Sequence, residues 1–118
     1  MTLMLKRVYD APGPEDGFRV LVDRLWPRGV SKEAAKVDLW LKEVAPSPDL
    51  RKFFNHDPER WEEFRSLYTK ELDGNSAVDT IRERMREGDV TLVYAARDRA
   101  INHAAVLAAF IERSGEVR

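Results

Sequence analysis

Residues 90–96, Val-Thr-Leu-Val-Tyr-Ala-Ala, constrain the fold more than any other part of this sequence. The run is apolar and rich in strand-forming residues, and it shows little alternation between apolar and polar positions. That pattern is typical of a central strand that is buried on both faces of a sheet. We therefore predict an α/β fold in which a small, mainly parallel sheet carries helices packed on its faces.

The rest of the chain fits this architecture. Strands are expected at residues 3–9 and 18–22, separated by a loop rich in proline and glycine. Capping residues and apolar spacing predict helices at residues 31–35, 48–55, 57–74, 76–88 and 100–113. Residues 37–44 fit a strand or a helix equally well. The 118 residues suit one hydrophobic core, so we expect a single domain, residues 1–118.

Composition excludes several classes of protein. A net charge of −1 gives no bulk electrostatic reason to expect binding to nucleic acid. No apolar run reaches the roughly 18 residues of a membrane crossing, and the N-terminus lacks the pattern of a secretory signal, so a cytoplasmic protein is expected. The chain has no cysteine, which excludes disulfides, thiolate nucleophiles and Cys-based metal sites. We expect no metal and no cofactor, and the oligomeric state stays open.

Charged and aromatic residues gather directly after the strand expected at residues 18–22. Asp23, Arg24, Trp26 and Arg28 belong to the end of this strand and to the loop that follows. Ligands of open α/β sheets bind at the carboxyl ends of the strands. We expect Arg24 and Arg28 to clamp an anion, Asp23 to orient one guanidinium, and Trp26 to form a wall of the site.

A second group follows the strand at residues 90–96 and meets the first if the two strands are parallel. Tyr94 is expected to form a wall, and Arg97 adds a cation. Asn102 and His103 lie at the start of the next helix, where the histidine can donate to a ligand or move a proton near neutral pH. The predicted catalytic residues are His103 and Asp23, and the predicted ligand-binding residues are Arg24, Trp26, Arg28, Tyr94, Arg97 and Asn102.

These residues predict a pocket for a small anionic ligand, similar to a phosphate or a nucleotide. A hydrolase or transferase acting on a phosphorylated compound is compatible with them, although the sequence shows no common enzyme motif. One alternative is a nucleic-acid-binding or regulatory protein. A second alternative is a non-catalytic interaction module with Trp26 and Trp40 facing a partner. The basic patch of the first alternative would comprise Arg82, Arg84, Arg86, Arg97 and Arg99.

Structural interpretations of the same residues stay open. Asp23 and Arg24 can form an ion pair that fixes the strand end. Trp26 can belong to the core, and His103 can bond to a backbone carbonyl. Asp57 has a sufficient role as a helix cap, which makes a metal or acid–base role together with His56 less favoured.

The block from Val22 to Gly29, Val-Asp-Arg-Leu-Trp-Pro-Arg-Gly, is similar to the YeaO-like family of small bacterial proteins of unknown function. So are residues 56–64, His-Asp-Pro-Glu-Arg-Trp-Glu-Glu-Phe, and residues 91–98, Thr-Leu-Val-Tyr-Ala-Ala-Arg-Asp. The resemblance covers almost the whole chain and implies no established activity. Longer relatives resemble it more weakly around Asp23, Arg24 and His103. They carry two cysteines that this chain lacks, so the resemblance implies no thiol chemistry.

Overall fold

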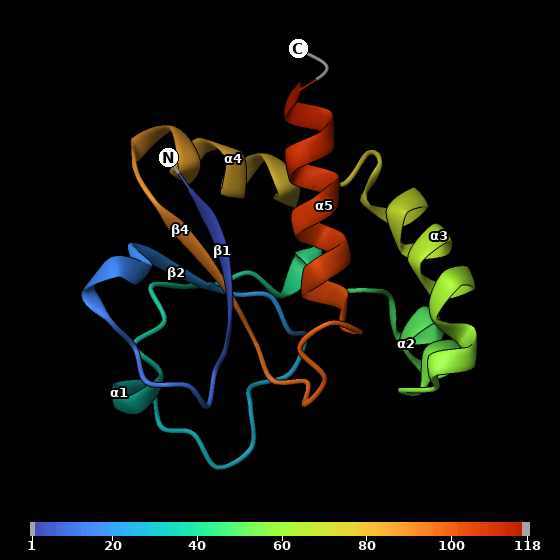
Figure 1. The fold of residues 1–118 in the computed structure, drawn as a ribbon, viewed down its shortest axis with the longest axis horizontal. Helices are drawn as coiled ribbons and strands as arrows, with labels where there is room; N and C mark the ends of the chain where they lie inside the picture. The colour runs from blue at the N-terminus through green and yellow to red at the C-terminus, as the bar shows by residue number, and fades with distance from the viewer. Residues whose placement is uncertain (1, 117–118) are drawn as a thin grey trace.

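The computed structural model describes residues 2–116, and its centre is a four-stranded sheet in which every pairing is parallel. The strand order is β1-β4-β2-β3 (Figure 1). The strands are β1 (Leu3–Arg7), β2 (Phe18–Leu21), β3 (Leu39–Trp40) and β4 (Val90–Tyr94). All five residues of β4 are buried, as expected for a central strand. The predicted α/β class and parallel sheet are confirmed.

The register of the sheet determines where the polar segments meet. β2 pairs with β4 so that Phe18 is opposite Val90 and Leu21 is opposite Val93. Because the two strands are parallel neighbours, both carboxyl ends reach the same edge of the sheet. The segments that follow β2 and β4 therefore leave the sheet side by side.

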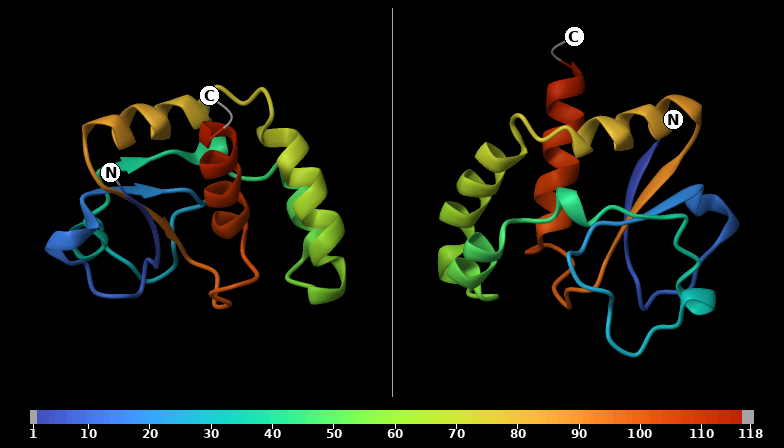
Figure 2. Two further views of the ribbon diagram at one scale, coloured as in Figure 1. Left: turned by 45° about the horizontal axis from the view of Figure 1, so that its top comes forward. Right: turned by 180° about the vertical axis from the view of Figure 1, so that it is seen from behind.

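The helices cover the two faces of the sheet unequally. The hydrophobic core joins one sheet face to α2, α3, α4 and α5, whereas a smaller cluster on the other face involves α1 and nearby loops. Figures 1 and 2 show α1 apart from the other four helices. The bounds are α1 (Lys32–Ala35), α2 (Pro48–Phe54), α3 (Trp61–Leu72), α4 (Ala77–Glu87) and α5 (His103–Glu116). No helix in the described part of the chain is both long and apolar enough for a membrane crossing.

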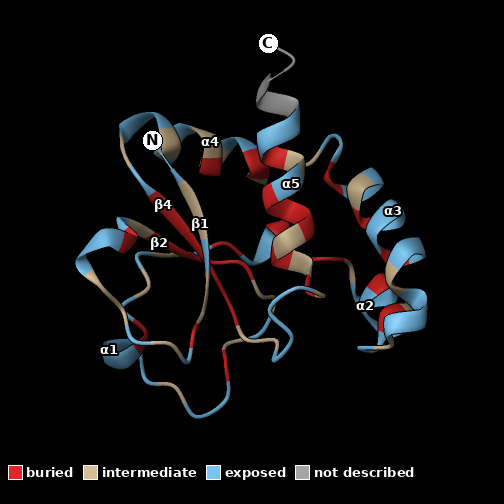
Figure 3. Ribbon diagram, in the orientation of Figure 1, coloured by how far each residue is buried: buried red, intermediate tan, exposed pale blue. Residues whose placement is uncertain are grey.

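Buried residues run through the sheet and the inner sides of α3 and α5 (Figure 3). Val20 and Leu92 are completely buried on the sheet, and Tyr68 of α3 is buried beside them in the same core. The Tyr68 hydroxyl donates a hydrogen bond of 2.6 Å to the carbonyl oxygen of Val44. Burial raises the pKa of this phenol, so it stays neutral and its hydrogen bond holds α3 against the segment before α2.

Several expected boundaries shift because local capping competes with helix extension. The strand expected at residues 3–9 ends at Arg7. Asp57 caps a separate 3₁₀ turn, Pro58–Arg60, so α3 begins at Trp61 instead of continuing from Asp57. α5 begins at His103, later than expected, because Asp98 binds the backbone N–H groups of the residues in between. The ambiguous residues 37–44 form β3 and a short 3₁₀ turn.

Candidate functional site

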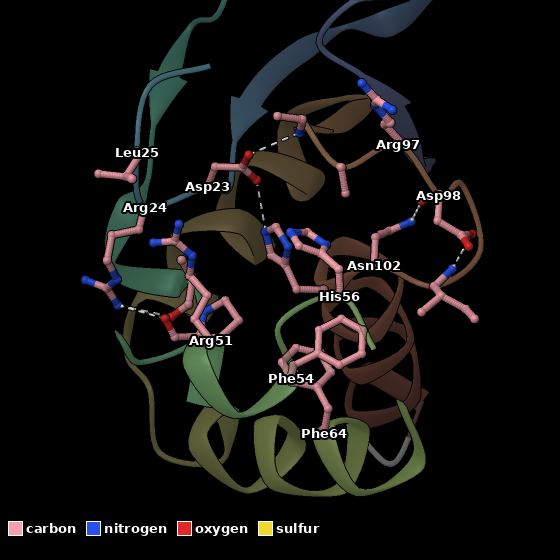
Figure 4. Close-up of a pocket in the computed structure, with 16 residues that line it drawn as sticks. Asp23, Arg24, Leu25, Arg51, Phe54, His56, Phe64, Arg97, Asp98 and Asn102 are labelled. Carbon is pink, nitrogen blue, oxygen red and sulfur yellow. Dashed lines mark hydrogen bonds and ion pairs between the residues drawn. The ribbon is translucent and has the colours of Figure 1, made fainter. Parts of the chain in front are cut away.

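A cavity of about 580 Å³ opens at the carboxyl edge of the sheet. Its lining comes from the segments after β2 and β4, from the residues around α2, and from α3 and the start of α5 (Figure 4). Five of the residues predicted from the sequence meet there. These residues are Asp23, Arg24, Arg97, Asn102 and His103.

Asp23 joins the ends of the two central strands and faces His103. Its Oδ2 atom accepts a hydrogen bond of 3.1 Å from the backbone N–H of Ala95. Its buried Oδ1 atom lies 3.1 Å from His103 Nε2 but makes no well-aligned hydrogen bond. Nε2 also lies 3.1 Å from the carbonyl oxygen of Val22. Because a carbonyl only accepts, Nε2 must carry the hydrogen in this contact, which is the carbonyl bond that one interpretation of the sequence anticipated.

Arg24 is held by backbone carbonyls and has no carboxylate partner in the described chain. Its Nη2 donates to the carbonyl oxygens of Ala45 and Pro46, at 3.3 and 3.2 Å. Its Nε atom is buried and makes no hydrogen bond to residues 2–116. No hydrogen bond or ion pair joins Asp23 to Arg24 within residues 2–116, because the carboxylate is directed to Ala95 and His103. Arg24 therefore forms no ion pair within residues 2–116, although the Asp23 carboxylate lines the same cavity.

Arg51 and His56 line the cavity although the sequence did not single them out as site residues. Arg51 lies on α2, whose start is fixed by the Ser47 hydroxyl accepting from the N–H of Leu50. His56 follows the helix in a left-handed conformation with φ 55°, directly after Asn55 with φ 43°. The sequence signals were Asn55, because asparagine tolerates this conformation at a helix end, and the His56–Asp57 pair, whose metal or acid–base role was the less favoured interpretation.

The loop between β4 and α5 is shaped by its own polar side chains. Asp98 Oδ1 accepts from the N–H groups of Ile101 and Ala100, and these bonds lower the pKa of the carboxyl. The Asn102 amide donates to the Asp98 carbonyl at 2.9 Å, and its oxygen accepts from Ala105 N–H at 2.8 Å. Asn102 is 2% exposed, so its polar atoms serve the loop and the helix start.

Three other residues predicted for the site lie outside this cavity. Trp26 donates from Nε1 to the Val30 carbonyl at 2.7 Å and packs on the second sheet face. Tyr94 is 2% exposed and belongs to the core. Arg28 is exposed in the loop, where its carbonyl accepts from the Tyr9 hydroxyl. Sequence proximity to Asp23 and Arg24 therefore did not place these residues on the cavity wall.

The surfaces named in the two alternatives have their own contacts. Trp40 is 37% exposed, meets the ring of Trp26 edge-on at 5.5 Å, and donates from Nε1 to the Asp23 carbonyl at 2.8 Å. Three of the five arginines of the basic patch face carboxylates. The pairs are Arg82 with Asp79, Arg84 with Glu87 and Arg99 with Asp10.

The arginines of the cavity lining are among those that form no ion pair within residues 2–116. Three arginines line the cavity, and none of them pairs with a carboxylate within residues 2–116. Two aspartates, Asp23 and Asp98, also line the cavity. One carboxylate oxygen of each accepts hydrogen bonds from backbone N–H groups. By contrast, six arginines elsewhere pair with acids. These are Arg19, Arg60, Arg65, Arg82, Arg84 and Arg99.

No group of three or more His, Asp or Glu side chains among the described residues is arranged to hold a metal ion. The lining of the cavity thus offers guanidinium and imidazole donors, together with a wall of apolar side chains. Such a lining suits an uncharged or anionic ligand with polar and apolar parts.

Residues 2–117 match a protein family described as the inactive DUF488-N3 subclade, DUF488-N3i. The chain is 41% identical over 113 residues to the uncharacterized protein YeaO of Escherichia coli, covering 92% of this chain and 95% of YeaO. It is 48% identical over 102 residues to uncharacterized proteins of Mycobacterium tuberculosis and Mycobacterium bovis, covering 86% of each chain. No solved structure matches it significantly. The chain belongs to the DUF488-N3i family and is YeaO-like, as the sequence blocks predicted.

Proposed function

We propose that this protein binds a small ligand carrying a phosphate-like anion in the cavity at the carboxyl edge of the sheet. The observation that carries the proposal is the set of three lining arginines without carboxylate partners in the described chain. Arg24 and Arg51 lie on the same side of the cavity, and Arg97 lies on the other side (Figure 4). The anion would bind between Arg24 and Arg51, where two guanidiniums can share its oxygens.

The proposed role is binding and not catalysis. Within the described lining there is no serine, threonine, cysteine or lysine to serve as a covalent nucleophile. The Nε2 atom of His103 already faces the Val22 carbonyl, and Asp23 Oδ2 holds the Ala95 N–H. The word "inactive" in the family description supports the same interpretation.

The test is calorimetric titration of the native protein with inorganic phosphate, ribose 5-phosphate and AMP. The variant is Arg51→Gln, because this exposed side chain lines the cavity and makes no hydrogen bond or ion pair with residues 2–116. Loss of one charge-assisted hydrogen bond should weaken binding of the phosphorylated probes by about tenfold to a hundredfold. The melting temperature without ligand should not change.

The matched control is Arg86→Gln. Arg86 is an exposed arginine on α4 outside the cavity lining, so its removal changes the net charge equally. The affinity of the Arg86→Gln variant for the probes should equal that of the native protein. Equal binding by native protein and Arg51→Gln, or the absence of binding by all three probes, would refute the proposal.

A further inference from the structure

The cavity has more room and more apolar lining than an isolated anion requires. Its volume of about 580 Å³ falls in the range of about 300–1,000 Å³ that accommodates drug-sized ligands. Phe54, Phe64 and Ile101 contribute apolar surface beside the arginines. A ligand that fills this space must therefore carry a sizeable apolar or flat part in addition to its anion.

Aromatic rings form a continuous row on this part of the wall. The rings of Phe54 and Phe64 stack with centroids 4.4 Å apart and planes 21° apart. Phe64 is held in turn by Tyr68 at 5.7 Å in the core. His56 continues the row outward, with its ring 6.2 Å from Phe54. The buried phenylalanines thus support an imidazole that is itself exposed.

His56 is placed by backbone geometry and not by side-chain bonds. Its ring makes no hydrogen bond or ion pair with residues 2–116, and its φ of 55° lies in the left-handed region, which histidine adopts more often than most residues other than glycine. The close-up shows His56 near the middle of the cavity, above Phe54 and Phe64, with Arg24 and Arg51 to one side (Figure 4). A flat, exposed ring beside two cations is an arrangement suited to a ligand that joins a ring to a phosphate.

We propose that the ligand is a nucleoside monophosphate whose base stacks on the His56 imidazole while its phosphate lies between Arg24 and Arg51. This inference rests on the proposed function and adds the chemical nature of the rest of the ligand. Stacking on an aromatic side chain favours every nucleobase, because each has a π-face. The sugar spans the distance between the ring and the guanidiniums.

The test compares AMP with ribose 5-phosphate, which has the same sugar and phosphate but no base. The variant is His56→Gly, since glycine adopts positive φ without strain and removes the ring. His56→Asn is the second variant, because asparagine also tolerates this conformation. Both variants should keep the native fold, as checked by circular dichroism and melting temperature.

The native protein should bind AMP about tenfold or more tightly than ribose 5-phosphate, and both variants should lose about that factor for AMP alone. Equal affinity of the native protein for the two probes, or an equal loss for both in the variants, would overturn the nucleotide inference and leave anion binding intact. An AMP affinity unaffected by both variants would also overturn it. If neither of these probes nor inorganic phosphate binds, the proposed function itself fails.

Discussion

Two arginines, one within β2 and one in the segment that follows it, have different environments. Arg19 lies within β2 and is 3% exposed, and its Nη1 donates to Asp16 Oδ2 at 2.6 Å. Its other nitrogens donate to the Ala35 carbonyl at 2.8 and 3.1 Å. Arg24 follows β2, its Nη2 donates to two carbonyls, and within residues 2–116 its buried Nε makes no hydrogen bond and its guanidinium no ion pair. The residue type is the same, but only one of the two charges is neutralised.

The difference separates a structural charge from one that is available to a ligand. Burial alone would raise the pKa of Asp16, but hydrogen bonds from Lys6, the Gly13 N–H and Arg19 outweigh it, and the pKa lies below its usual value. The carboxylate is therefore ionised and fully used within the fold. At the cavity, the three arginines form no ion pair within residues 2–116, and the proposed function assigns them to a ligand. The following predictions test that contrast.

The largest expected effect is on stability at the Asp16 and Arg19 pair. Arg19→Ala leaves a buried carboxylate with only part of its partners, and breaking such a pair costs about 3–5 kcal/mol. The free energy of unfolding in urea should fall by about that amount. The affinity for phosphorylated probes should not change in protein that remains folded. A loss of affinity without a loss of stability would reverse the roles assigned to the two arginines.

An intermediate effect on stability is expected at Asp23, which lines the cavity but whose hydrogen bond stabilises the fold. Asp23→Ala leaves the Ala95 N–H without its acceptor, and an unsatisfied backbone donor costs about 1–3 kcal/mol. Asp23→Asn retains an acceptor oxygen, so its free energy of unfolding, measured by chemical denaturation, should fall by less than that of Asp23→Ala. Because both changes remove a negative charge near the proposed anion, Asp23→Asn should not weaken binding of ribose 5-phosphate. If asparagine destabilises as much as alanine, the charge matters more than the hydrogen bond.

The smallest effect is expected for Asp10 and Arg99. Like Asp16 and Arg19 they form an ion pair, but this pair lies at the surface. The hydrogen bond from Arg99 lowers the pKa of Asp10 from 3.8 to about 2. A lowered pKa stabilises the fold above the unfolded value near 3.8, and that contribution is lost as the pH falls through about 2. Asp10→Asn should therefore be less stable than native protein by about 1 kcal/mol or less at pH 7.

The measurement for this pair is unfolding free energy at a series of pH values for the native protein and Asp10→Asn. The difference should be constant above about pH 5 and shrink as the pH falls through the two pKa values. Arg99→Gln serves as the matching change on the other side of the pair. A difference that grows as the pH falls would show that the carboxylate does not stabilise the folded state.

Part of the site was predictable because it depends on strand ends. Parallel neighbours finish at one edge, so the segments after β2 and β4 had to approach each other, and Asp23, Arg24, Arg97 and His103 lie around one cavity. The contacts they make there were not predictable. Asp23 meets a backbone N–H 72 positions along the chain. Arg51 lies on α2 and His56 follows it. The apolar pattern of this helix does not predict which cavity it borders.

The sequence by itself determined the local and class-level features of this protein. The apolar run at residues 90–96, of which Val90–Tyr94 form β4, the caps Ser31, Ser47 and Asp57, and the family blocks all depend on residues close together in the chain. Only the tertiary structure decided the order β1-β4-β2-β3, the partners of each charge, and the place of His56. Helix and strand patterns reflect short-range sterics and hydrogen bonding. Whether an arginine is neutralised depends on which distant segment packs against it.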